Sequence, residues 1–125
     1  MLRLSHKHIQ QLTDECRRAY PKEACGLLAG QNGQVAKVFP LTNVEHNPVG
    51  CAWRADSRQQ FQAFQEIERE GWQLLAIYHS HPHSPAFPSP NDVKSALYPD
   101  ALYLIVSLLD VERPDVRAFR IRDGR

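Results

Sequence analysis

Residues 79–92, HSHPHSPAFPSPND, contain three of the six histidines, four prolines and an aspartate. His79 lies near the end of an apolar run, WQLLAIYHS (72–80), that predicts a buried strand, and His81 directly follows that run. In an extended chain residues i and i+2 share a face, so both imidazoles should point to one side and Ser80 to the other. Such a pair can share a metal ion, but a lone His-x-His is also common where both rings are solvated.

Asp92 is the third candidate ligand. Ser89-Pro90-Asn91-Asp92 has the pattern of a helix start, with Ser at the cap, Pro at the first position and Asp at the third. A carboxylate there interacts favourably with the helix dipole, and it can also return toward the two imidazoles. Two His and one carboxylate leave a fourth tetrahedral position for water, which is the arrangement of a catalytic zinc. Zinc lowers the pKa of such a water to about 7.

A hydrolytic zinc site also needs a base, and Glu23 is the candidate. It follows Pro21-Lys22 and opens the apolar run ACGLLA, an unusual place for a carboxylate. Taken alone, Glu23 is better interpreted as a solvated charge at a strand end. Glu23 is therefore a candidate base only in combination with the candidate metal ligands His79, His81 and Asp92.

The rest of the chain predicts helices that alternate with mostly apolar strands. Ser5 and Asp56 can cap two helices, which end near Pro21 and Gly71. Strands are expected at 23–30, 34–41, 72–80, 101–109 and 115–122, with a loop at 42–50 and a short extended piece at 51–55. This order indicates an α/β or α+β layered fold, and 125 residues predict a single domain, 1–125. Phe61, Phe64 and Trp72 are expected in the core.

Composition argues against several other classes of protein. The formal net charge is +1 and basic residues are scattered, so nucleic-acid binding is not expected. No apolar run approaches the length of a membrane span. Three cysteines, Cys16, Cys25 and Cys51, show no CxxC spacing, which argues against a disulfide framework. The N-terminus does not resemble a signal peptide, and we expect a reduced, cytoplasmic protein.

Taken together, these residues resemble the JAMM (MPN+) metalloprotease motif. That motif is a Glu in an early strand, then His-[Ser/Thr]-His, seven residues, Ser, two residues and Asp. Here it reads Glu23, HSH at 79–81, PHSPAFP at 82–88, Ser89, PN and Asp92. The stretch PKEACGLLAG around Glu23 is also similar to the corresponding stretch of small prokaryotic members of this family. The resemblance covers residues 2–122 and implies an MPN fold, a curved mixed β-sheet flanked by helices and similar to the cytidine-deaminase-like architecture.

The resemblance also implies a role for each motif residue. His79, His81 and Asp92 would bind one Zn²⁺. Glu23 would take a proton from the attacking water and return it to the departing amine. Ser89 would donate a hydrogen bond to the oxyanion.

The family cleaves amide or isopeptide bonds after the C-terminal Gly-Gly of ubiquitin-like proteins. Only eight residues separate Asp92 from Ala101, so the chain lacks the insertions that larger members use to hold a second ubiquitin. We therefore expect a sulfur-carrier protein of the ThiS/MoaD type as substrate. The alternatives are a non-catalytic MPN scaffold and a zinc amidohydrolase with another substrate. A nucleoside deaminase is excluded because Pro-Cys-x-x-Cys is missing, and near-neutral charge disfavours a RadC-type protein.

Four residues near the motif keep open interpretations. His83 would be a fourth ligand if the extended run continued, although the prolines that follow favour a ring facing solvent or substrate. His46 is better explained as an ordinary loop histidine than as a groove residue. Cys25 is expected to be a core thiol. Phe87 fits a contact for the substrate and an anchor of the loop equally well.

Overall fold

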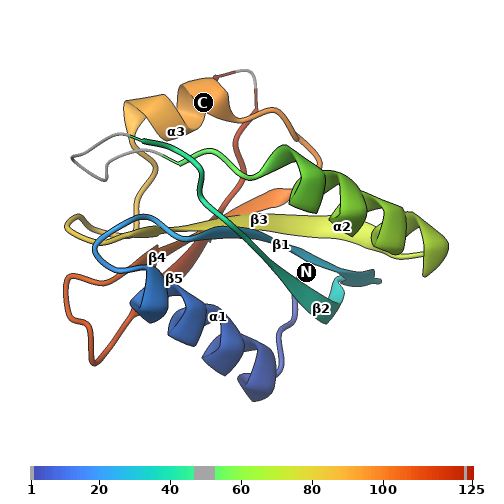
Figure 1. Ribbon diagram of the computed structural model, residues 1–125, viewed down its shortest axis with the longest axis horizontal. Coiled ribbons are helices and arrows are strands. Elements are labelled where there is room, and N and C mark those ends of the chain that lie inside the picture. The colour runs from blue at the N-terminus through green and yellow to red at the C-terminus, as the bar shows by residue number, and fades with distance from the viewer. Residues whose placement is uncertain (1, 47–52, 123) are drawn as a thin grey trace.

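The computed structural model describes residues 2–46, 53–122 and 124–125. Figure 1 shows a central sheet with α1 on one side and α2 and α3 on the other. The elements within these residues are α1 (His6–Ala19), β1 (Cys25–Gln31), β2 (Gln34–Leu41), α2 (Ser57–Arg69), β3 (Gln73–His81), α3 (Pro90–Ser95), β4 (Leu102–Ser107) and β5 (Asp115–Phe119). Each matches an element expected from the sequence, with ends that differ by a few residues.

The sheet is mixed. Its strand order is β2-β1-β3-β4-β5, in which only β3 and β4 run parallel. A tight turn with positive φ at Asn32 (54°) and Gly33 (78°) joins β1 to β2. Parallel strands need a crossover, and the segment from His81 through α3 supplies it. The motif loop therefore leaves the carboxyl end of a central strand, between two neighbours in the sheet.

Two hydrophobic clusters fill the two faces of the sheet. The first lies under α1 and includes Leu12, Cys16 and Tyr78, each fully buried. The second lies under α2 and includes Ala63 and Ile67. Successive residues of β3 alternate between them, with Ala76 and Tyr78 in the first and Ile77 in the second. The same alternation turns His79 and His81 toward the side of α2 and α3.

Side-chain caps begin all three helices. The side chain of Ser5 accepts a hydrogen bond from the N–H of His8, and that of Asp56 accepts one from the N–H of Gln59. Ser89 and Asp92 form a reciprocal capping box at α3. The helix starts predicted from sequence are thus confirmed.

Residues 42–44 and 54–56 form a short antiparallel ribbon beyond β2, where the sequence indicated a loop for 42–50. The N–H of Val44 donates to the carbonyl of Arg54 at 2.8 Å, and the N–H of Asp56 donates to that of Thr42 at 2.9 Å. Asn43 pairs with Ala55 between these bonds. The first two residues of the expected 51–55 piece lie outside the described residues.

The prediction that Phe61 belongs to the core is wrong, because this residue is 64% exposed. Helix α2 buries a stripe that contains Ala63 and Ile67, and at 100° per residue Phe61 falls well outside it. Phe64 and Trp72 are partly buried against the second cluster.

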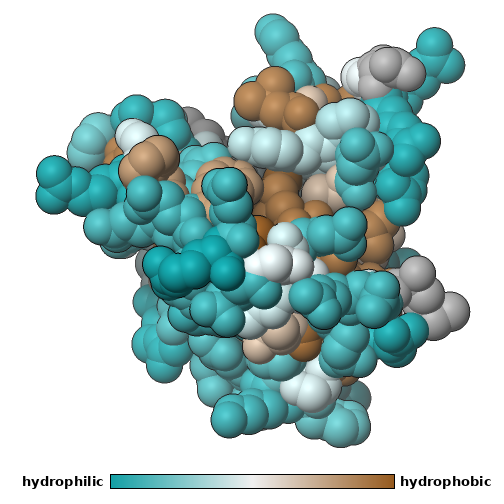
Figure 2. Space-filling view, turned by 90° about the vertical axis from the view of Figure 1, so that its right-hand side faces the viewer, coloured by the Kyte–Doolittle hydropathy of each residue, from teal (hydrophilic) through white to brown (hydrophobic). Residues whose placement is uncertain are grey.

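The face of the molecule in Figure 2 is mostly hydrophilic, but it is hollowed where hydrophobic side chains show between polar ridges. No helix in the described parts of the chain has the length and apolar character needed to cross a membrane.

Candidate metal centre

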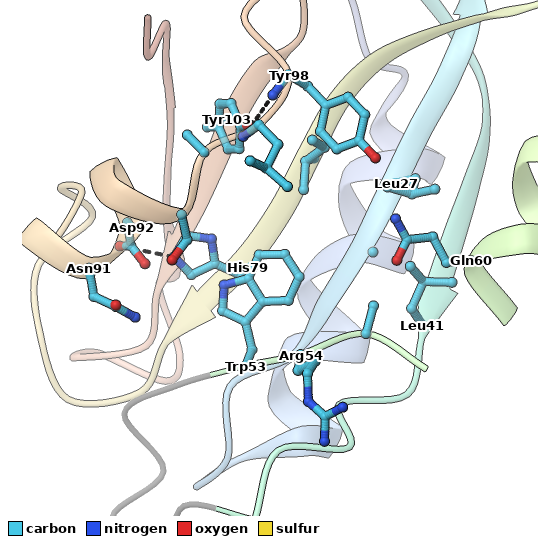
Figure 3. A pocket seen from close by; sticks show the side chains of 16 residues that line it. Leu27, Leu41, Trp53, Arg54, Gln60, His79, Asn91, Asp92, Tyr98 and Tyr103 are labelled. Atoms are coloured by element: carbon cyan, nitrogen blue, oxygen red, sulfur yellow. Dashed lines mark hydrogen bonds and ion pairs between the residues drawn. The ribbon is translucent and has the colours of Figure 1, made fainter. Parts of the chain in front are cut away.

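Three side-chain atoms converge at the end of β3. The Nε2 atoms of His79 and His81 lie 3.1 Å apart, and Asp92 Oδ2 lies 3.2 Å and 3.0 Å from them. His79 and His81 are 2% and 5% exposed. The structure thus brings together the three residues expected to bind metal, as Figure 3 shows for His79 and Asp92.

This donor triangle fits a metal ion. A tetrahedral zinc site with bonds of about 2.0–2.1 Å has its ligand atoms about 3.3 Å apart, close to the separations found here. Two imidazole nitrogens and a carboxylate oxygen are also a donor set that zinc accepts. Within residues 2–46, 53–122 and 124–125, no other group of three His, Cys, Asp or Glu residues converges in this way.

Neighbouring backbone groups fix two of the three side chains. Nδ1 of His81 lies 2.9 Å from the carbonyl oxygen of Pro85, which directs Nε2 toward the centre. Asp92 Oδ2 accepts a hydrogen bond from the N–H of Ser89 at 2.9 Å, and the N–H of Asp92 donates to Ser89 Oγ at 3.0 Å. The capping box and the proline-rich loop therefore hold the donors in place before any ion arrives.

The carboxyl of Asp92 is kept ionised. Burial raises its pKa, but hydrogen bonds from His79 and His81 outweigh burial and hold the pKa well below its usual range. A carboxylate that is ionised at all ordinary pH values is the form that binds a cation.

Glu23 lies just before β1 and is only 6% exposed. Burial raises the pKa of Glu23 to about 7, with a smaller opposing effect from His81 and a smaller raising effect from Asp92. Its backbone carbonyl accepts a hydrogen bond from Asn43 Nδ2 at 2.9 Å. The interpretation of Glu23 as a solvated charge is therefore wrong, and a buried carboxyl that titrates near neutrality suits proton transfer.

Ser89 is partly buried at the N-terminus of α3. Its Oγ accepts the capping hydrogen bond from Asp92, so its own hydroxyl hydrogen is left to donate elsewhere. A bound carbonyl oxygen is a suitable acceptor.

The structure decides some of the interpretations that the sequence left open for residues near the motif. His83 is exposed and packs edge-on against Tyr20 with ring centroids 5.4 Å apart, so it is not a fourth ligand. His46 is also exposed.

Cys25 is a core thiol that is 1% exposed, and burial raises its pKa to about 12. The ring centroids of Phe87 and Phe119 lie 5.5 Å apart, yet Phe87 is 69% exposed. Both interpretations of Phe87, as a contact for the substrate and as an anchor of the loop, therefore remain.

A mostly apolar pocket of about 280 Å³ adjoins the centre. His79 and Asp92 form one end, and Figure 3 shows the pocket continuing between the segment of Trp53 and the segment of Tyr98. Its other lining residues include Leu27, Leu41, Arg54, Gln60, Ile77, Asn91, Ala96, Leu97 and Tyr103. Two of the three residues of the donor triangle therefore belong to the lining of this pocket.

Sequence reasoning missed two residues that shape the site. Trp53 stacks on the ring of His79, with centroids 5.6 Å apart and planes 25° apart. Asn43 joins the backbone of Glu23 to that of Arg54. Neither residue belongs to a recognisable motif, and no local pattern marks either of them as part of a site.

The fold and the site together define a small α+β protein whose candidate metal centre lies beside a buried carboxyl, the arrangement of a metal-dependent hydrolase. The chain belongs to the family described as prokaryotic homologs of the JAB domain, whose profile matches residues 5–122.

Among its relatives, a CysO-cysteine peptidase of Mycobacterium tuberculosis is 39% identical over 118 residues, which cover 93% of this chain and 80% of that protein. A probable TtuB-protein conjugate cleaving protease of Thermus thermophilus is 44% identical over 108 residues, which cover 86% of this chain and 68% of that protein.

Solved structures agree on the fold. Protein DSY2949 of Desulfitobacterium hafniense superimposes with a TM-score of 0.86 at 35% identity, over 98% of this chain and 86% of that one. AF2198, a JAB1/MPN domain protein of Archaeoglobus fulgidus, superimposes with a TM-score of 0.65 at 17% identity, over 95% and 89% of the two chains. The MPN fold expected from the motif is therefore confirmed.

Proposed function

We propose that this protein is a zinc-dependent peptidase that hydrolyses the amide bond after the C-terminal Gly-Gly of a ubiquitin-like sulfur-carrier protein. The observation that carries the proposal is the convergence of His79, His81 and Asp92. Buried Glu23 lies close enough to this group for the charges of His81 and Asp92 to shift its pKa. The names of two relatives support the substrate class, since one is a peptidase of CysO-cysteine and the other cleaves TtuB-protein conjugates. We propose that residues 1–125 act as one catalytic domain in the cytoplasm.

In this proposal His79, His81 and Asp92 hold the ion. When bound, zinc acts as a Lewis acid that polarises the scissile carbonyl and makes water a stronger acid. Glu23 takes a proton from the attacking water onto a carboxylate oxygen and then delivers it to the departing amine. The Ser89 hydroxyl donates to the carbonyl oxygen as negative charge develops there.

The pocket indicates how the substrate lies. His79 and Asp92 line it, whereas Glu23 is not among its lining residues. Because Glu23 delivers the proton to the amine, the amine side of the scissile bond belongs near Glu23. The carrier tail then extends on the other side, into the pocket. Two glycines suit a tail that passes beside the donor triangle because they carry no side chains.

Intact-mass analysis tests the proposal. The substrate is a ThiS/MoaD-like carrier that bears a short extension after Gly-Gly, incubated with zinc-loaded wild type, Glu23→Ala or Phe61→Ala. We expect the extension to be lost with wild type and with Phe61→Ala, whose exposed side chain lies outside the site. Glu23→Ala should leave the carrier intact. An unchanged mass with all three proteins, each holding one zinc, would reject the substrate class and favour the scaffold alternative.

A further inference from the structure

The two histidines of the donor triangle are supported differently. Histidines that bind metals usually donate a hydrogen bond from the second ring nitrogen, which fixes the ring and its tautomer. His81 has such a partner, since its Nδ1 lies 2.9 Å from the carbonyl oxygen of Pro85. Nδ1 of His79 is buried and has no hydrogen-bond partner among the described residues. Something other than a hydrogen bond must orient this ring.

Trp53 is the contact that can do so. Its indole stacks on the imidazole of His79 at 5.6 Å and 25°, a geometry of attractive aromatic pairs. The ring of His81 lies 5.0 Å from His79 at 57°. These two aromatic contacts restrict rotation of the His79 ring, which is 2% exposed. Figure 3 shows the indole of Trp53 lying beside His79, and both residues line the pocket.

The backbone next to Trp53 is itself held firmly. The N–H of Arg54 donates to Asn43 Oδ1 at 3.0 Å, and the carbonyl of Arg54 accepts from Val44 at 2.8 Å. Nδ2 of the same Asn43 donates to the carbonyl of Glu23 at 2.9 Å. One amide side chain therefore connects the backbone that carries the indole to the backbone that carries the candidate base.

We propose that Trp53 is a positioning residue that orients the imidazole of His79 for metal binding, in place of the hydrogen bond that Nδ1 lacks. This inference rests on the role of His79 as a ligand in the proposed function. The stacked indole keeps Nε2 aimed at the centre of the donor triangle and excludes water from one face of the ring.

Zinc affinity tests the inference without any peptide substrate. Competition with a chromogenic chelator would compare wild type, Trp53→Leu, Trp53→Phe and the matched control Phe61→Leu on the exposed side of α2. Loss of one aromatic contact should weaken zinc binding by about 3- to 10-fold in Trp53→Leu. Trp53→Phe should stay within about 2-fold of wild type because it keeps a ring in place. Phe61→Leu should match wild type.

Equal zinc affinity of Trp53→Leu and wild type would overturn the role of Trp53 and leave the metal site standing. A wild type that binds no zinc would overturn both this inference and the proposed function. Thermal unfolding of the metal-free proteins would show whether Trp53→Leu folds.

A second measurement does not depend on removing the indole. The chain has two tryptophans, so Trp72→Phe leaves Trp53 as the only source of tryptophan emission. We expect that emission to change during zinc titration and to saturate at one equivalent. Emission that stays constant while zinc binds would overturn the proposal.

Discussion

The buried hydroxyl of Ser80 accepts a hydrogen bond from the backbone N–H of Ala24 at 2.8 Å, and the N–H of Ser80 donates to the carbonyl of Ala24 at 3.0 Å. Ser80 stands between His79 and His81, and Ala24 directly follows Glu23. This pair of bonds therefore sets the position of the candidate base relative to two donor atoms of the metal centre. It also explains why a fully buried position of β3 carries a hydroxyl.

Ser80→Ala should lower the free energy of unfolding by about 1–3 kcal/mol, because the buried N–H of Ala24 loses its acceptor. Ser80→Thr keeps the hydroxyl and should lose less. Urea unfolding of the metal-free proteins measures both changes. A Ser80→Ala protein as stable as wild type would mean that this bond contributes nothing to the fold.

Glu23→Gln should keep its zinc and lose about 10²- to 10⁴-fold in peptidase activity, because the amide cannot take up the proton. Metal analysis and the intact-mass assay measure the two properties on the same sample. Glu68→Gln, on the exposed surface of α2, is the matched control and should behave as wild type. Activity of Glu23→Gln near the wild-type level would remove Glu23 from the mechanism.

Metal-free wild type should lose stability relative to metal-free Glu23→Gln as pH rises. Burial raises the folded-state pKa of Glu23 to about 7, above the ordinary value of about 4.3. The stabilising effect of the protonated carboxyl is complete below about pH 4.3 and is lost as pH rises to about 7, by about 4 kcal/mol in total. Urea unfolding of both proteins across this range measures the difference. A constant difference would show that the carboxyl is not buried in the metal-free protein.

Gln60→Trp should raise KM more than it lowers kcat, because Gln60 lines the pocket and a larger side chain there obstructs the carrier tail. We expect an increase in KM of about 10-fold, equivalent to about 1.4 kcal/mol of lost binding. Gln62→Trp places the same indole on the exposed surface of α2 and is the control. If the two variants have equal KM values, the tail does not occupy this pocket.

Local sequence patterns predicted much of the fold and the positions of the donor residues. The caps at Ser5, Asp56 and Ser89 depend on contacts within three residues, and the shared face of His79 and His81 follows from strand geometry. Such short-range effects are visible in the sequence.

The parts that escaped prediction depend on contacts between distant segments. Asn43 reaches the carbonyl of Glu23 across 20 residues, and Trp53 stacks on His79 from a segment far from β3 in the sequence. Phe61 has the residue type of a core position but lies off the buried stripe of α2. Only the packed structure decides such cases. The catalytic and metal-binding roles of the motif residues stay predictions.

Zinc-edge X-ray absorption on the zinc-loaded protein tests the central claim most directly. We predict one zinc per chain, surrounded by two imidazole nitrogens and by oxygen at about 2.0–2.2 Å, with no sulfur. Asp92→Asn should reduce the bound zinc. A sulfur shell at about 2.3 Å would place the ion at a cysteine and contradict a centre built from His79, His81 and Asp92.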